Sequence, residues 1–148
     1  MTTESRPPDG RGAGAGPPGG GPAAGVLVVE DDHAIREWLR DALTDEGYAV
    51  VAVETGRAAL ARLASWRPRL ILLDLKMPDL DGWGFRAAQL ADPAIATIPV
   101  VVMTAGAGAG ATPAEAIARL TPAALLRKPF DLDVLLDTVL RFLEGPPD

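Results

Sequence analysis

The sequence predicts an α/β fold in which a parallel, five-stranded sheet is covered by helices on both faces. Five short apolar runs lack the polar alternation of a half-exposed strand, and each is followed by a segment with helical spacing of its apolar residues. Buried strands that alternate with helices form parallel sheets. Right-handed crossovers then give a doubly wound, three-layer sandwich.

The predicted strands are the apolar runs themselves. They are Val26–Val29, Ala49–Val53, Leu70–Leu73, Val100–Met103 and Ala123–Leu126. The flavodoxin-like order, in which the strands lie as 2-1-3-4-5 across the sheet, fits five units of this kind. In that order the first and third strands are neighbours, so their carboxyl ends meet at one edge of the sheet.

The first predicted helix follows the first strand, with Asp32 as its N-cap and Gly47 at the C′ position after its end. Its apolar residues have the spacing of one helix face. They are Ile35, Trp38, Leu39, Ala42 and Leu43. The second and third helices are predicted at Ala58–Leu63 and Phe85–Leu90.

Two further helices complete the pattern. Thr112 is predicted to cap a weak fourth helix that has Pro113 at its first position. Asp131 is predicted to cap the fifth helix. One apolar face of this last helix is formed by Leu132, Leu135, Leu136, Val139 and Leu143.

Both ends of the chain are predicted to lie outside the folded domain, which we place at residues 25–144. The first 25 residues contain eight glycines and five prolines, too little apolar surface to offset the entropy of ordering them. Residues 1–24 are therefore predicted to be a disordered tail, and residues 145–148 a disordered C-terminus. The tail also lacks the charged and apolar regions of a secretory signal.

Charge and composition exclude several classes of protein. The net charge is −6, and the charged residues of the tail cancel, so the folded part carries the excess. An acidic domain without a basic stripe is a poor partner for nucleic acid. The apolar runs are far shorter than the ~20 residues of a membrane span. Cysteine is absent, which excludes disulfides and thiolate metal sites, and a cytoplasmic location is expected.

Three predicted strands are followed by residues that carry chemistry. Glu30 and Asp31 follow the first strand, and Asp74 follows the third. Because these strands are neighbours in the predicted order, three carboxylates would meet and repel one another. A divalent cation together with Lys128, which lies at the end of the fifth strand, would balance their charge. Oxygen ligands and a water-bearing coordination shell suit Mg²⁺.

Such a site predicts phosphoryl transfer to Asp74. A carboxylate is deprotonated at neutral pH and can attack phosphorus directly. The metal ion and Lys128 would stabilise charge on the transferred group, and Thr104 at the end of the fourth strand would reach the same place. The product is a reactive acyl phosphate, which suits a reversible signal.

Four motifs resemble the receiver domain of two-component response regulators. They are VVEDD at Val28–Asp32, LLDLKMPDLDG at Leu72–Gly82, VMTA at Val102–Ala105 and KPF at Lys128–Phe130. All four stand in the family's order and at its spacing, and the resemblance covers roughly residues 25 to 144. It implies that a sensor histidine kinase or a phosphotransfer protein donates phosphate to Asp74.

The resemblance also implies the ligands of the metal ion. Asp31, Asp74 and the backbone carbonyl of Lys76 would ligate Mg²⁺, and Glu30 would hold a metal-bound water. These assignments come from the family and not from spacing alone.

The phosphorylated state has implied contacts as well. Thr104 would bond one phosphoryl oxygen and Lys128 would pair with another, with Ala105 and Pro129 in supporting positions. The family's Lys-Pro bond is cis, so the bond between Lys128 and Pro129 is expected to be cis.

The signal would leave the domain through the surface formed by the fourth helix, the fifth strand and the fifth helix. The family usually has an aromatic residue three positions before the lysine, where this chain has Leu125. The loop at 106–111 alternates glycine and alanine and is predicted to be mobile without phosphate. Val134, Leu140 and Phe142 widen the apolar surface of the last helix, which indicates either extra burial or a surface for a protein partner or homodimer.

The sequence thus predicts a stand-alone receiver that switches a protein-binding surface and catalyses only its own phosphorylation and dephosphorylation. A phosphatase of the haloacid dehalogenase type also uses an Asp nucleophile, but it needs a second Asp two residues later, where this chain has Lys76. A receiver-like domain that signals without phosphate typically loses the Asp, Thr or Lys, and all three are present here. Leu125 keeps this second alternative open.

Overall fold

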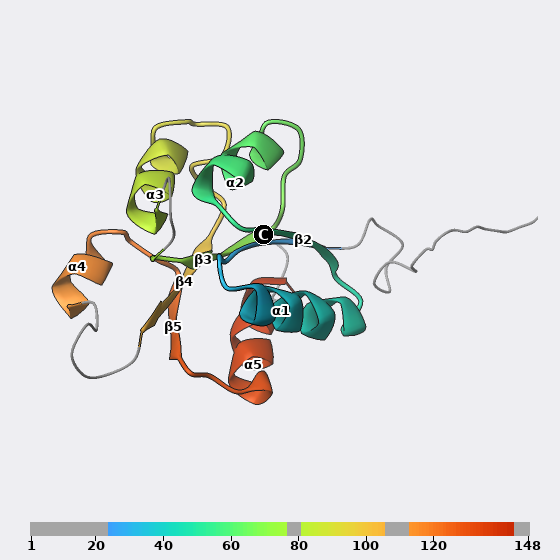
Figure 1. The fold of residues 1–148 in the computed structure, drawn as a ribbon. Helices are drawn as coiled ribbons and strands as arrows, with labels where there is room; N and C mark the ends of the chain where they lie inside the picture. The colour runs from blue at the N-terminus through green and yellow to red at the C-terminus, as the bar shows by residue number, and fades with distance from the viewer. Residues whose placement is uncertain (1–23, 77–80, 106–112, 144–148) are drawn as a thin grey trace, which may run out of the picture.

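The computed structural model describes residues 24–76, 81–105 and 113–143, and in these ranges it has the predicted three layers (Figure 1). The strands are β1 (Gly25–Val29), β2 (Ala49–Val53), β3 (Leu70–Asp74), β4 (Val100–Ala105) and β5 (Ala124–Lys128). The helices are α1 (His33–Asp45), α2 (Gly56–Leu63), α3 (Gly82–Leu90), α4 (Ala114–Ala118) and α5 (Leu132–Leu143). The predictions for residues 1–23, the loop at 106–111 and the C-terminal residues fall outside the described residues.

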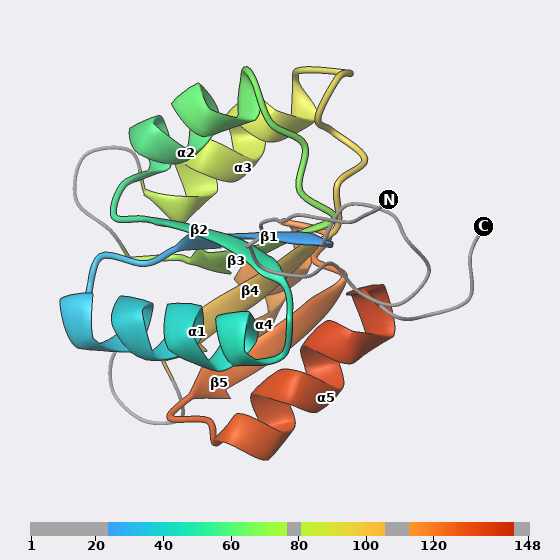
Figure 2. The same ribbon diagram turned by 90° about the vertical axis from the view of Figure 1, so that its right-hand side faces the viewer.

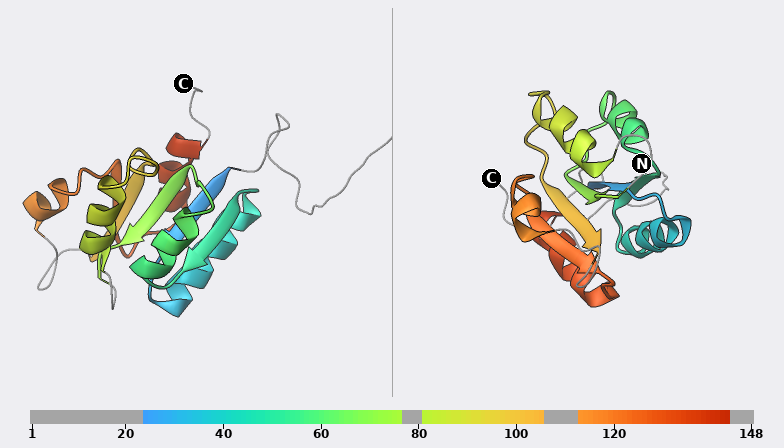
Figure 3. Two further views of the ribbon diagram at one scale, coloured as in Figure 1. Left: turned by 90° about the horizontal axis from the view of Figure 1, so that it is seen from above. Right: turned by 60° about the vertical axis from the view of Figure 1, so that its left-hand side comes forward.

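The five strands form one parallel sheet in the predicted order β2-β1-β3-β4-β5. Figure 3 shows these strands side by side, and the register pairs Val29 of β1 with Leu73 of β3 and Leu73 with Val102 of β4. The carboxyl ends of the three central strands therefore lie at one edge of the sheet. Within the described ranges, no helix is both long and apolar enough to cross a membrane.

Alternate residues of the buried strands face two separate apolar clusters. Val26 and Val28 contribute to a cluster shared with α1 and α5, whereas Leu27 and Val29 contribute to one shared with α2, α3 and α4. Figure 2 shows α1 and α5 on one side of the sheet and α2 and α3 on the other. Both faces of the sheet are thus buried, which explains the absence of polar alternation in the strands.

Side-chain caps set the starts of four helices. Asp32, Thr55, Asp81 and Asp131 each accept a hydrogen bond from a backbone N–H three residues later. The predicted caps Asp32 and Asp131 are confirmed. The second and third helices begin earlier than predicted, at Gly56 and Gly82, because Thr55 and Asp81 provide caps upstream of the apolar residues.

Other predicted helix ends had mixed outcomes. Gly47 follows the end of α1 with a φ of +94°, as predicted for a C′ glycine. Pro113 was predicted at the first position of the fourth helix, but it occupies the N-cap position without a side-chain hydrogen bond. The predicted cap Thr112 lies outside the described residues.

The last helix differs from its predicted apolar face at one position. Leu135, Val139 and Leu143 are buried, but Leu132 is 44% exposed. Helical side chains lean toward the N-terminus, so the side chain of this first residue extends past the start of the helix. Leu132 thus shares the apolar face by its spacing but is not buried in the core.

A buried polar network joins α3 to the loop between α4 and β5. Arg86 is 6% exposed and donates to the carbonyl oxygens of Leu120 (2.9 Å) and Thr121 (3.1 Å) and to Oε1 of Gln89 (2.7 Å). The side-chain amide of Gln89 in turn donates to the backbone carbonyls of Ile95 and Ile98, each at 3.0 Å. Burial lowers the pKa of Arg86, but each of its three nitrogens donates to one of these acceptors.

Candidate functional site

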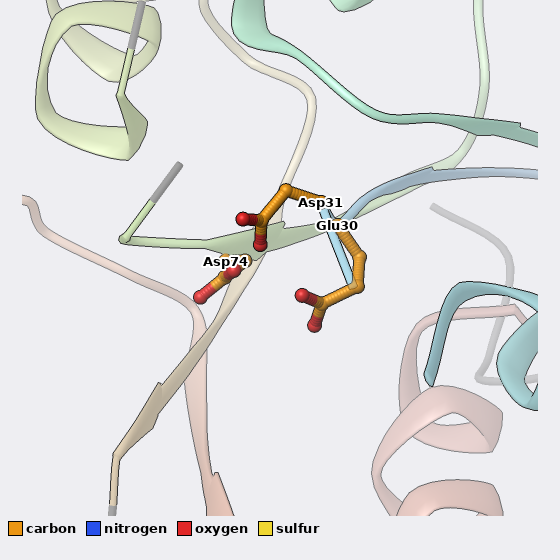
Figure 4. A group of neighbouring side chains, drawn as sticks. All are labelled: Glu30, Asp31 and Asp74. Atoms are coloured by element: carbon orange, nitrogen blue, oxygen red, sulfur yellow. The ribbon is translucent and has the colours of Figure 1, made fainter. Parts of the chain in front are cut away.

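Three carboxylates converge at the edge where β1 and β3 end. Glu30 and Asp31 directly follow β1, and Asp74 is the last residue of β3. Each offers one carboxylate oxygen, and these three oxygens lie within 4.8 Å of one another. Figure 4 shows the three side chains extending from the strand ends toward a common point. The parallel pairing of β1 with β3 causes this convergence, as the sequence predicted.

The three acids differ in their access to water. Glu30 is fully buried and Asp74 is 5% exposed, whereas Asp31 is exposed. The ammonium of Lys128 lies 2.8 Å from Oε1 of Glu30 and 3.4 Å from Oδ1 of Asp74. Lys128 therefore bridges the two buried carboxylates, and its position at the end of β5 brings it across the sheet edge to them.

The electrostatics of the cluster centre on Asp74. Burial, a hydrogen bond with Glu30 and the charge of Glu30 raise the pKa of Asp74 from its ordinary 3.8 to about 7, although Lys128 and the N–H of Lys76 act in the opposite direction. Burial alone would lower the pKa of Lys128, but the carboxylates of Glu30 and Asp74 outweigh it and raise that pKa. The single positive charge of Lys128 thus faces the two buried carboxylates of Glu30 and Asp74.

A cavity of about 280 Å³ opens beside Asp74. It is lined by the three acids and by Asp32, Ile35, Leu75, Lys76, Thr104 and Lys128. Thr104 is 2% exposed and lies one residue before the end of β4. The N–H of Lys76 donates to Oδ1 of Asp74 at 3.3 Å, which brings the main chain of Lys76 to the same cavity. The cavity therefore joins an acid cluster, a hydroxyl and an ammonium.

Other residues singled out from the sequence lie around this cavity. The Lys128-Pro129 bond is cis, as expected. Ala105 ends β4 and pairs in register with Lys128 of β5. Leu125 is half-buried and packs against the cluster under α2, α3 and α4, and it is not among the described residues that line the cavity. Its role as a switch stays a prediction, as does that of the Lys76 carbonyl as a metal ligand.

Arg36 was missed by the sequence patterns, and its guanidinium contacts the backbone of Glu30 and Asp31. Its Nη1 donates to the carbonyl oxygens of Glu30 (3.0 Å) and Asp31 (3.2 Å). The available signal was an arginine one turn into the helix that follows the acidic run. That signal is weak, because arginine at such a position is usually solvated.

Comparisons with known proteins agree with this geometry. Response regulator FleR of Pseudomonas aeruginosa is 42% identical over 123 residues, which are 83% of this chain and 25% of FleR. Response regulator MprA of Mycolicibacterium vanbaalenii is 39% identical over 113 residues, which are 75% of this chain and 46% of MprA. The chain thus spans a quarter to about half the length of these curated relatives.

The structural comparison leads to the same family. The chemotaxis response regulator CheY4 of Vibrio cholerae has a TM-score of 0.72 and 30% identity, over 81% of this chain and 98% of CheY4. A family model described as the response regulator receiver domain matches residues 26–140. With its sheet order and its acid cluster at the sheet edge, this chain belongs to the response regulator receiver domain family.

Proposed function

We propose that this chain is a phosphorylation-controlled switch in which Asp74 accepts a phosphoryl group with the help of Mg²⁺. The observation that carries the proposal is the arrangement around Asp74. Its nearly buried carboxylate contacts Lys128 at 3.4 Å, shares a 4.8 Å cluster with two other acids and faces a cavity that Thr104 also lines. Receiver domains of response regulators take part in two-component phosphorelays.

The residues present fit a bound Mg²⁺. Glu30, Asp31 and Asp74 bring up to three negative charges, against one positive charge on Lys128. The raised pKa of Asp74, caused first by burial and then by the neighbouring Glu30, supports a role for a further cation. When bound, Mg²⁺ would neutralise the remaining charge and polarise the phosphoryl oxygens. Asp31 and Asp74 would ligate it, with the Lys76 carbonyl as a third protein ligand and Glu30 acting through water.

The transfer itself needs only displacement at phosphorus. A carboxylate oxygen of Asp74 forms a bond to the phosphorus of the donor, and the bond from phosphorus to the donor atom breaks. The bonding electrons leave with the donor group, which is an imidazole nitrogen if the donor is a histidine kinase or phosphotransfer protein. Lys128 would pair with one phosphoryl oxygen, and the Thr104 hydroxyl would bond another. In a second displacement, water would attack the phosphorus and the bond to the Asp74 oxygen would break, which restores the carboxylate and releases inorganic phosphate.

The proposed output is a change in a protein-binding surface and not the turnover of a substrate. The surface consists of α4, β5 and α5, and Leu125 on β5 is the proposed relay. On α5, the side chain of Val134 is 47% exposed, which supports a role of this helix in protein binding. Leu140 and Phe142 instead pack against the core. A homodimer through this surface and a cytoplasmic setting also belong to the proposal.

Acetyl phosphate tests the proposed reaction without knowledge of the kinase. The chain is incubated with acetyl phosphate and Mg²⁺, and its intact mass is measured over time. We expect the mass of one phosphoryl group to be added in wild type and no addition in Asp74→Asn or in EDTA. The variant Asp41→Asn, which removes an exposed acid of α1, is the matched control and should behave as wild type.

Absence of an adduct in wild type would contradict the proposal and favour a receiver that signals by docking alone. An adduct that persists in Asp74→Asn would assign the reaction to another residue.

A further inference from the structure

Hydrogen bonds hold most of the backbone between β1 and α1. The N–H of Glu30 donates to the carbonyl of Val53 on β2 at 3.0 Å, and the N–H of Asp32 donates to Oε2 of Glu30 at 3.2 Å. The carbonyl of Asp32 accepts from the N–H of Arg36 at 2.9 Å. The two remaining carbonyls of this segment, those of Glu30 and Asp31, accept from Nη1 of Arg36 at 3.0 and 3.2 Å.

Arg36 reaches this segment from the first turn of α1. Its Nη2 lies 3.1 Å from Nδ1 of His33, which must act as the acceptor because a guanidinium has only donors. This third contact fixes the rotation of the guanidinium plane. The side chain therefore closes a ring from α1 back to the strand end, and the backbone of Glu30 and Asp31 forms part of that ring.

Of the acids in this segment, Asp31 depends most on the ring of contacts for a fixed position. Its side chain is exposed, whereas Glu30 is fully buried and is fixed by Lys128 and by the N–H of Asp32. An exposed carboxylate loses conformational entropy when it becomes a metal ligand, and a fixed main chain reduces that loss. The contact from Arg36 to the Asp31 carbonyl supplies this fixation.

We propose that Arg36 is a positioning residue that sets the main chain of Glu30 and Asp31 so that their carboxylates are ready for the metal ion. This inference rests on the proposed function, because it assumes that the cluster binds Mg²⁺. Arg36 acts through backbone carbonyls and does not itself contact the phosphoryl group or the metal ion.

Electrostatics alone would give Arg36 the opposite effect. A positive charge near the acids repels Mg²⁺, so removal of that charge, with no change in geometry, strengthens metal binding. Loss of the contacts that position the Glu30 and Asp31 backbone has the opposite effect and weakens Mg²⁺ binding. The sign of the change in Mg²⁺ affinity therefore distinguishes the two roles, and a purely structural role of Arg36 in the stability of α1 moves the affinity in neither direction.

The experiment measures the Kd for Mg²⁺ by calorimetric titration of wild type, Arg36→Ala, Arg36→Lys and Arg40→Ala. Arg40 lies one turn further along α1, is exposed and pairs with Glu37, so its removal makes the same charge change without touching the acid segment. We expect Arg36→Ala to raise the Kd roughly tenfold, as is usual when support of metal ligands is lost. Arg40→Ala should leave the Kd unchanged or lower it slightly.

Arg36→Lys preserves the charge and separates geometry from electrostatics. A lysine lacks the planar fork that contacts His33 and both carbonyls, so we expect a rise in Kd smaller than that of Arg36→Ala. Phosphorylation by acetyl phosphate should slow in the same order at a fixed, subsaturating Mg²⁺ concentration. If Arg36→Ala does not fold, the comparison of Arg36→Lys with wild type decides the question.

Equal or lower Kd values in the folded Arg36 variants, while wild type binds Mg²⁺ and accepts phosphate, would overturn this inference and leave the proposed function intact. A wild-type protein that binds no Mg²⁺ would overturn both.

Discussion

Replacement of Asp74 by Asn should stabilise the metal-free protein at alkaline pH. The folded state raises the pKa of Asp74 to about 7, against an ordinary value of 3.8, chiefly through burial and the neighbouring Glu30. At any pH between these two pKa values, the carboxyl group of Asp74 holds a proton more often in the folded chain than in the unfolded chain. Stability therefore falls as pH rises from about 4 to about 7 and is flat above that range. Asn is neutral at every pH, so the stability of the variant does not fall in this way as pH rises.

The size of the effect follows from the same two values. Each pH unit between them corresponds to about 1.4 kcal/mol, so the interval from 3.8 to about 7 sets a limit of roughly 4 kcal/mol. The carboxylate faces a water-accessible cavity, and screening by that water reduces the effect. We expect Asp74→Asn to exceed wild type by about 2 kcal/mol in free energy of unfolding at pH 8, and to match it near pH 4.

Urea denaturation in EDTA at pH 4, 5, 6, 7 and 8 measures this difference. All other titrating groups are common to both proteins, so the difference between the two curves reports Asp74 together with its interactions with Glu30 and Lys128. Asp41→Asn removes an exposed acid and should parallel wild type at every pH. Parallel curves for wild type and Asp74→Asn between pH 4 and pH 8 would refute the assignment of a raised pKa to Asp74.

Three further substitutions test the packing around the site by the free energy of unfolding in EDTA and the rate of phosphorylation by acetyl phosphate. Lys128→Met leaves the buried carboxylate of Glu30 without its cation, and should destabilise the chain by about 3 kcal/mol at pH 8 and slow phosphorylation. Gly82→Ala would place a Cβ 2.6 Å from the carbonyl oxygen of Asp74, and should cost about 1–3 kcal/mol and slow phosphorylation. Arg86→Met leaves buried carbonyls without a donor and should cost about 3 kcal/mol, with little change in the phosphorylation rate. If any of the three variants has the same free energy of unfolding as wild type, the contact that was removed or crowded in that variant does not stabilise the fold as argued.

Most of the fold could be predicted because its strands are local, continuous apolar runs. Each run occupies a central strand buried on both faces or, for β2 and β5, an edge strand, and the flavodoxin-like strand order fits five such units. Helix starts were less predictable because apolar spacing begins only where a helix meets the core. Thr55 and Asp81 cap their helices before that point. The exposure of Leu132 depends on where α5 begins relative to the sheet, which spacing alone does not give.

The acid cluster was predictable because strand order brings the ends of β1 and β3 together. Arg36 and Arg86 were not, because both act through backbone carbonyls, which the sequence does not display. Arg86 contacts Leu120, 34 residues away, and an arginine in a helix gives no sign that it is buried. Such contacts depend on the packed structure and not on local pattern.

The position of the phosphoryl group along the chain decides whether Asp74 is the residue that accepts phosphate. After incubation with acetyl phosphate and Mg²⁺, the acyl phosphate is reduced with borohydride, which converts the modified aspartate to homoserine, and peptides are analysed by mass spectrometry. We predict homoserine at position 74 alone. Unmodified Asp74, or homoserine at Asp31 in its place, would contradict the account.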